Sequence, residues 1–321
     1  MDAATDGARQ GADEESPAHV TTTTHTLDVP GARLCYDVRG HGPLLLMIGS
    51  PMGSRGFTAL ATLLAADFTV VSYDPRGILR STLSDPDQPA PPELVADDVR
   101  RLIAELDAGP AHVFGNSGGA TTGLALLARH PDAVRSLVAH EPPVTELLPD
   151  ARQVRAAIDD LCEDYAAGRR DVALRKYSAL SGVGFASPPP AGQASTRALY
   201  TPPKDVRAIL DRFFGRILQP TTRYRPDLDA LRTASVPVVV AGGTTSRGQL
   251  YHRTAAALAE LLDTPLAAFP AGHTGFQEHP EPFADLLREA FAPHRQTRME
   301  RNGTQLPGQP PVGAHTEPLD H

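Results

Sequence analysis

The most informative stretch of the chain is residues 111–119, Ala-His-Val-Phe-Gly-Asn-Ser-Gly-Gly. It opens with apolar residues that favour a strand, and a helical pattern begins just after Ser117. The motif G-x-S-x-G between a strand and a helix places a serine on a sharp, strained turn. Such a turn brings Gly115 and Gly119 together, so both positions need small residues. The free amide of Gly118 at the helix start could then bind a developing oxyanion.

Outward from this motif, apolar runs and amphipathic stretches alternate along the chain. Strands are predicted within Thr22–Arg39 (two, joined by a turn at Pro30-Gly31) and at Pro43–Ile48, Phe68–Tyr73, Ala111–Gly115, Val134–His140, Pro237–Ala241 and Pro265–Phe269. Helices are predicted at Pro92–Leu106, from Ser117 to about His130, and at Leu250–Leu262 and Glu281–Phe291. Alternation of this kind favours an α/β fold with a mainly parallel, eight-stranded twisted sheet and helices on both faces. The first two strands lack a helix between them and should pair antiparallel at one edge.

Composition divides the chain into four parts. Residues 1–21 and 295–321 are polar and poor in large apolar side chains, so both are expected to be disordered. Residues 142–233 break the rhythm with helical stretches near 150–168 and 202–217 and a Pro-rich loop at 187–191. We expect a helical cap there, inserted after the sixth strand over the carboxyl edge of the sheet. The core would then comprise residues 22–141 and 234–294.

Charge and composition exclude several classes of protein. The formal net charge is −8, from 30 basic and 38 acidic residues, which disfavours nucleic acid and anionic membranes as partners. No apolar run near the N-terminus approaches the length of a spanning helix or a secretory signal, so a cytoplasmic location is expected. The two cysteines, Cys35 and Cys162, are expected to be free buried thiols.

On these residues and their order, the chain resembles the α/β-hydrolase superfamily over about residues 22–294. The resemblance implies that Ser117 is the nucleophile after the fifth strand, that a helical cap follows the sixth, and that the catalytic histidine follows the eighth. His273 stands in that last place, in Phe-Pro-Ala-Gly-His-Thr-Gly (269–275). His279 is a weaker candidate because it precedes Pro280 at a helix start, and His112 lies inside a strand.

A second oxyanion donor is expected from the loop after the third strand, where the family often has H-G-x-P. Here the loop reads Ile-Gly-Ser-Pro-Met-Gly (48–53), with Ile48 in place of the histidine. Pro51 has no N–H to donate. The amide of Ser50 is therefore the predicted donor, and Met52 is the alternative.

The acid is the weak member of the predicted triad. In most of the family it follows the seventh strand, but Gly-Gly-Thr-Thr-Ser-Arg-Gly (242–248) has no carboxylate, and Thr245 or Ser246 occupies the usual position. A few members of the superfamily carry the acid after the sixth strand, where this chain has Glu141. We therefore expect Glu141 to orient His273, with a Ser–His dyad or a degraded triad as alternatives.

A serine nucleophile with a histidine base suits acyl transfer, so the sequence favours hydrolysis of an ester, thioester or lactone. Epoxide and haloalkane hydrolysis need a carboxylate nucleophile and are disfavoured. Two alternatives on the same fold stay open: C–C bond hydrolysis, because of the weak similarity of Gly-Asn-Ser-Gly to serine C–C hydrolases, and a non-catalytic ligand-binding protein. A dinucleotide-binding unit is disfavoured, because Ser117 replaces the second glycine of G-x-G-x-x-G.

No metal-ligand spacing or cofactor motif appears, so no cofactor is expected, and the chain is expected to act as a monomer or homodimer. The partner would be an apolar or aromatic small molecule. The insertion supplies the aromatic side chains for such a pocket: Tyr177, Phe185, Tyr200, Phe213, Phe214 and Tyr224. The same rings could equally pack the cap helices against one another.

Overall fold

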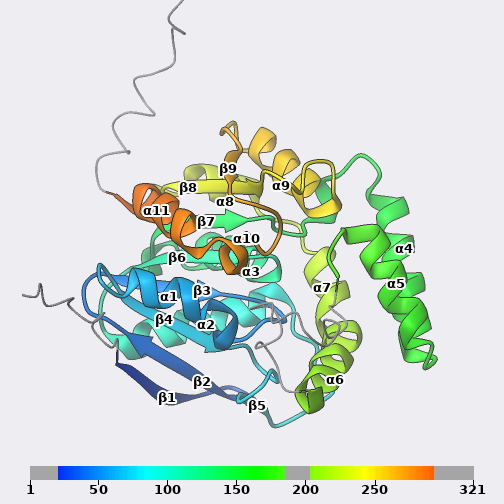
Figure 1. Ribbon diagram of the computed structural model, residues 1–321, viewed down its shortest axis with the longest axis horizontal. Coiled ribbons are helices and arrows are strands. Elements are labelled where there is room, and N and C mark those ends of the chain that lie inside the picture. Colours follow the sequence, from blue (N-terminus) through cyan, green and yellow to red (C-terminus); the bar gives the residue numbers. More distant parts are fainter. Residues whose placement is uncertain (1–20, 185–202, 293–321) are drawn as a thin grey trace, which may run out of the picture.

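The computed structural model describes residues 21–184 and 203–292 (Figure 1). The predictions of disorder at 295–321 and, apart from Thr21, at 1–21 lie outside these residues. The Pro-rich loop and the aromatic residues Phe185 and Tyr200 lie outside them as well. No helix among the described residues is long and apolar enough to cross a bilayer.

One twisted sheet forms the centre of the molecule, in the order β1-β2-β4-β3-β6-β7-β8-β9. Its strands are β1 (Thr22–Val29), β2 (Ala32–Arg39), β3 (Leu44–Ile48), β4 (Thr69–Asp74), β6 (Ala111–Asn116), β7 (Val134–His140), β8 (Val238–Gly243) and β9 (Ala267–Phe269). In this spatial order, every pair of neighbours from β4 through β3, β6, β7 and β8 to β9 is parallel. Strand β2 is antiparallel to both of its neighbours, β1 and β4. The mainly parallel sheet and its antiparallel edge are as predicted.

The count of eight strands needs one correction. The two-residue strand β5 (Thr82–Leu83) pairs with β2 beside the main path, so that the described residues form a sheet of nine strands. A strand this short has no alternation of apolar and polar residues, so no sequence pattern marks it.

Helices cover both faces of the sheet and divide the core into two clusters. On one face lie α2 (Pro92–Leu106), α3 (Gly118–Arg129) and α9 (Leu250–Leu261), and on the other lie α1 (Thr58–Leu64), α10 (Gly275–Glu278) and α11 (Pro280–Phe291). Strand β3 shows why its sequence is apolar throughout. Leu44, Leu46 and Ile48 face the first cluster, Leu45 and Met47 face the second, and all five side chains are buried.

Between β7 and β8 the chain forms a series of helices. These are η3 (Thr145–Leu147), α4 (Ala151–Ala166), α5 (Arg170–Ser181), α6 (Pro203–Arg212), a π-helical turn at Phe213–Ile217, α7 (Leu218–Thr222) and α8 (Leu228–Thr233). Figure 1 shows α4 to α7 together beyond one end of the sheet, whereas α8 lies with the strands. A third apolar cluster joins these helices to the core through Ile78, Val95 and Leu250.

Candidate active site

Ser117 occupies the turn between β6 and α3 in the strained geometry that the motif predicts. Its backbone has φ 56° and ψ −128°, with a positive φ that is rare for a residue with a side chain. The crowding around it explains the two glycines. A Cβ on Gly115 would lie 2.6 Å from the carbonyl oxygen of Gly119, and a Cβ on Gly119 would lie 1.9 Å from the carbonyl oxygen of Ile48. No side chain fits at either position.

The two predicted oxyanion donors, Ser50 and Gly118, lie next to each other and line one cavity with Ser117. A Cβ on Gly118 would lie 3.1 Å from both Cβ and the carbonyl oxygen of Ser50. Gly118 is the first residue of α3, so its N–H has no acceptor within the helix. The loops after β3 and β6 thus meet where a substrate carbonyl would have to lie.

Glu141 and His273 are joined by a hydrogen bond, although 132 positions separate them in the sequence. The distance from His273 Nδ1 to Glu141 Oε2 is 2.7 Å, and the side chains are 10% and 1% exposed. Glu141 follows β7 directly and also has a positive φ, of 49°. Its backbone N–H donates to the carbonyl oxygen of Ala241 at 2.9 Å, which ties it to β8.

The loop after β8, which lacks a carboxylate of its own, holds the carboxylate of Glu141. The amide of Gly243 donates to Glu141 Oε1 at 2.9 Å, and the hydroxyl of Ser246 donates to the same oxygen. Burial alone would raise the pKa of Glu141, but the hydrogen bond and charge of His273, the charge of His140 and the Ser246 hydroxyl outweigh it and lower the pKa to about 2. Glu141 is therefore ionised at neutral pH and can fix the ring of His273 with its Nδ1 protonated.

Two hydrogen-bond partners of Glu141 have no sequence signal that predicts them. The sequence indicates Ser246 only as a hydroxyl residue in the place of the missing acid, whereas its hydroxyl donates to the acid. Gly243 donates through its backbone amide, which no pattern of side chains in the sequence can indicate. The one sequence feature that could have indicated the role of Ser246 is its position, where most members of the superfamily have their carboxylate.

Three other histidines lie in structural surroundings: His140, His112 and His279. His140 is fully buried, its Nδ1 lies 2.7 Å from Asn116 Oδ1, and burial lowers its pKa to about 4. His112 bonds Ser136 Oγ through Nδ1 at 2.7 Å. His279 is the residue that precedes α11. The bond from His140 to Asn116 steadies the residue directly before Ser117.

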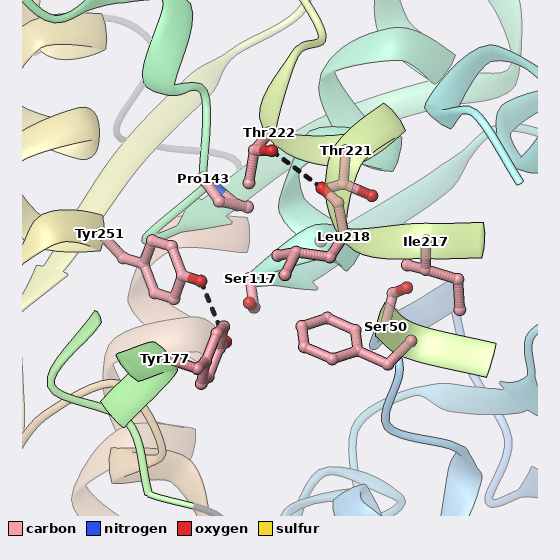
Figure 2. A pocket seen from close by; sticks show the side chains of 11 residues that line it. Ser50, Ser117, Pro143, Tyr177, Ile217, Leu218, Thr221, Thr222 and Tyr251 are labelled. Atoms are coloured by element: carbon pink, nitrogen blue, oxygen red, sulfur yellow. Dashed lines mark hydrogen bonds between the residues drawn. The ribbon is translucent and has the colours of Figure 1, made fainter. Parts of the chain in front are cut away.

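The cavity at Ser117 is small and mostly apolar (Figure 2). It is lined by Ser50, Ser117, Gly118, Pro143, Tyr177, Phe213, Ile217, Leu218, Thr221, Thr222 and Tyr251. Its free volume of about 10 Å³ holds roughly one water molecule. The free space beside Ser117 is therefore narrow.

Both interpretations of the aromatic residues apply, because the two rings that line the cavity also pack against each other, with the ring centroids of Tyr177 and Phe213 5.5 Å apart. Tyr177 and Phe213 line the cavity. Phe214 instead stacks on Tyr165 with ring centroids 4.5 Å apart, and Tyr224 belongs to the core cluster.

Within the described residues, Ser117 Oγ makes no hydrogen bond to His273, whose Nδ1 is bonded to Glu141. In enzymes without substrate, such bonds between nucleophile and base are often long and tighten on binding. No group of three His, Cys, Asp or Glu in the described part of the chain could hold a metal.

Comparisons with known proteins support the fold. A family model described as "alpha/beta hydrolase fold" matches residues 42–280. An uncharacterized hydrolase, YraK, of Bacillus subtilis (strain 168) is 33% identical over 275 residues, which are 84% of this chain and 96% of the relative. Zearalenone hydrolase of Bionectria ochroleuca is 26% identical over 277 residues, 85% and 99% of the two chains. The crystal structure of E-2-(acetamidomethylene)succinate hydrolase superposes with a TM-score of 0.58 at 22% identity, covering 84% of this chain and 98% of that one.

Proposed function

The chain belongs to the α/β-hydrolase fold family and is a hydrolase of that fold, and on this premise we propose that it cleaves an ester, thioester or lactone bond through an acyl-enzyme on Ser117. His273 is the base and Glu141 its orienting acid. The amides of Ser50 and Gly118 form the oxyanion hole. No cofactor takes part.

The proposed reaction has two halves. Ser117 Oγ attacks the substrate carbonyl while Nε2 of His273 takes its proton, and the amides of Ser50 and Gly118 bind the oxyanion that develops. His273 then returns the proton to the leaving group. Water, activated by the same nitrogen, hydrolyses the acyl-enzyme in the second half. Glu141 stays ionised throughout and stabilises the imidazolium.

The observation that carries the proposal is the 2.7 Å bond between His273 Nδ1 and the buried carboxylate of Glu141. It supplies the acid that the loop after β8 lacks and favours a triad over a dyad. The strained backbone of Ser117 supports its role as the nucleophile. A relative that is named for hydrolysis of zearalenone supports a small-molecule substrate.

We also propose that the described part of residues 142–233 acts as a cap over the site, since Tyr177 and Phe213 from this segment line the cavity. An apolar wall of this kind favours an apolar substrate.

The test is intact-mass analysis after exposure to a serine-directed fluorophosphonate. The wild type should gain one adduct and Ser117→Ala none. Ester turnover should vanish in the same variant. A wild type that stays unlabelled, or turnover that survives Ser117→Ala, would contradict the proposal and favour a ligand-binding protein.

A further inference from the structure

Two tyrosines meet above Ser117, one from the helices between β7 and β8 and one from the core. Tyr177 lies in α5 and Tyr251 in α9, and their hydroxyl oxygens are 3.0 Å apart. Both side chains are buried and both line the cavity of Ser117. Much of the remaining wall is apolar, formed by Pro143, Phe213, Ile217 and Leu218. The hydroxyl pair is thus a polar spot in a largely apolar surface.

The tyrosines lie on the side of the site where the leaving group must be. The ring of Tyr251 lies 4.9 Å from the ring of His273, at an angle of 38°. Figure 2 shows Ser117 between the tyrosine pair on one side and Ser50 on the other. A substrate carbonyl that points its oxygen toward Ser50 and Gly118 has its acyl chain and its leaving group on the side away from these donors. The leaving group is the one that faces His273, because His273 must return a proton to it, and the tyrosine pair lies beside this histidine.

The chemistry of the pair fits a hydroxyl better than a hydrocarbon. Each phenol can both donate and accept a hydrogen bond, as an alcohol can. Burial raises the pKa of Tyr177 to about 12 and that of Tyr251 well above its usual value, so both keep their protons at neutral pH. A hydrocarbon group in contact with the pair leaves their mutual hydrogen bond intact but adds none, whereas a hydroxyl can donate to a free lone pair on either phenol oxygen.

We propose that Tyr177 and Tyr251 are specificity-determining residues that select esters of small alcohols or phenols bearing a second hydroxyl near the ester oxygen. The inference rests on the proposed function, because it assigns the leaving-group side of the same serine site. The small free volume at Ser117 favours a short leaving group.

The experiment compares two esters that differ by one group. 2-Hydroxyethyl butanoate and propyl butanoate have nearly the same shape and release the same acid, so a pH-stat follows both. We expect kcat/KM of the wild type to favour the hydroxylated ester at least about tenfold, because sites built to bind a hydroxyl discriminate against analogues that lack it. In Tyr177→Phe, Tyr251→Phe and the double variant, this ratio should fall toward one.

Tyr165→Phe is the matched control. Tyr165 also lies in the inserted helices and its hydroxyl donates to Asp211 at 2.6 Å, but it does not line the cavity. This variant should keep the wild-type ratio. Thermal unfolding shows whether each variant is folded. If one single tyrosine variant is not, the ratio is measured with the other.

The outcomes separate this inference from the proposed function. A wild-type ratio near one, or a ratio that survives in the double variant, overturns the role of the tyrosines. Labelling of Ser117 by the fluorophosphonate with hydrolysis of neither ester shows that the leaving-group class is wrong. Absence of both labelling and hydrolysis overturns the proposed function itself, and the inference with it.

Discussion

At the scale of single residues, Glu141 is the side chain whose role can be tested most directly. Glu141→Gln keeps the shape but removes the charge that orients His273 and stabilises its imidazolium. We expect kcat to fall by about 10²- to 10⁴-fold, the upper value being the loss for the equivalent change in a serine protease. Steady-state ester hydrolysis measures this kcat, and the Ser117→Ala variant gives the background rate.

Glu260→Gln is the control for this prediction, because Glu260 is exposed at the end of α9. It should keep full turnover. A Glu141→Gln enzyme with wild-type kcat would remove Glu141 from the mechanism and leave a Ser–His dyad.

Ser246 is expected to act as a positioning residue through Glu141. Its hydroxyl donates to Glu141 Oε1, so Ser246→Ala weakens the hold on the carboxylate, and we expect kcat to fall about tenfold. Ser246→Thr keeps a hydroxyl and should recover part of the loss. Steady-state kinetics should show the change in kcat more than in KM, and equal losses in the alanine and threonine variants would indicate a packing role instead.

The site shows which residues a sequence can reveal. Ser117, Gly115 and Gly119 belong to one local motif whose backbone geometry dictates the residue types, so they were recognisable at once. Glu141 and Ser246 meet across 105 positions through a hydrogen bond that only the sheet order creates. The resemblance to superfamily members that carry the acid after the sixth strand suggests Glu141, but no local pattern connects Ser246 to it.

At the scale of helices and strands, prediction worked where one apolar pattern dominated. Residues 92–106 and 134–140 were predicted with the bounds that α2 and β7 have. No clear pattern predicts helix α5, since Arg-Asp-Val-Ala-Leu-Arg-Lys-Tyr at its start mixes charged residues into a weak apolar stripe. Its stability comes from packing in the third apolar cluster, to which Ala173 and Tyr177 contribute.

The π-helical turn at Phe213–Ile217 offers a test of element stability. Gly215 in this turn is exposed, and a Cβ there would meet nothing within 4 Å. Gly215→Ala should therefore raise the free energy of unfolding by about 0.5–1 kcal/mol, because alanine loses less backbone entropy than glycine. Urea unfolding measures the change.

Gly168 is the matched control, because its Cβ would also meet nothing within 4 Å but its φ is +80°. Gly168→Ala should lower the free energy of unfolding by about 1 kcal/mol, since a Cβ is strained in that region. Equal effects of the two substitutions would contradict the backbone argument.

At the scale of the whole molecule, the alternation of strands and helices was enough to predict the layers. Runs such as Leu44–Ile48 that are apolar at every position require cover on both faces, and the two core clusters provide it. How the inserted helices approach Ser117 was beyond sequence reasoning, because contacts such as the one between Tyr177 and Tyr251 join segments 74 positions apart.

Buried histidines should make the whole fold sensitive to mild acid. Burial lowers the pKa of His112 and of His140 to about 4, against an ordinary value of 6.5. Between these values the unfolded chain binds protons that the folded chain does not, so stability falls as pH drops from 6.5 toward 4. Glu141, with its pKa lowered from 4.5 to about 2, costs stability only below about pH 4.5. Between pH 4.5 and 6.5, the pH dependence of the free energy of unfolding therefore reports the two histidines and not this carboxylate.

His112→Phe isolates one of the two contributions. The new ring keeps aromatic packing beside Phe68 and Phe291, whose ring centroids lie 5.8 and 5.0 Å from that of His112. Each histidine contributes a slope of up to about 1.4 kcal/mol per pH unit, so the variant should show a shallower fall in the free energy of unfolding across the window. Urea unfolding at pH 6.5, 5.5 and 4.5 measures this slope.

Ser136→Ala is the control, because it removes the hydrogen-bond partner of His112 but keeps the imidazole, and it should retain the wild-type slope. An unchanged slope in His112→Phe would mean that this histidine is protonated in the folded protein as readily as in the unfolded chain.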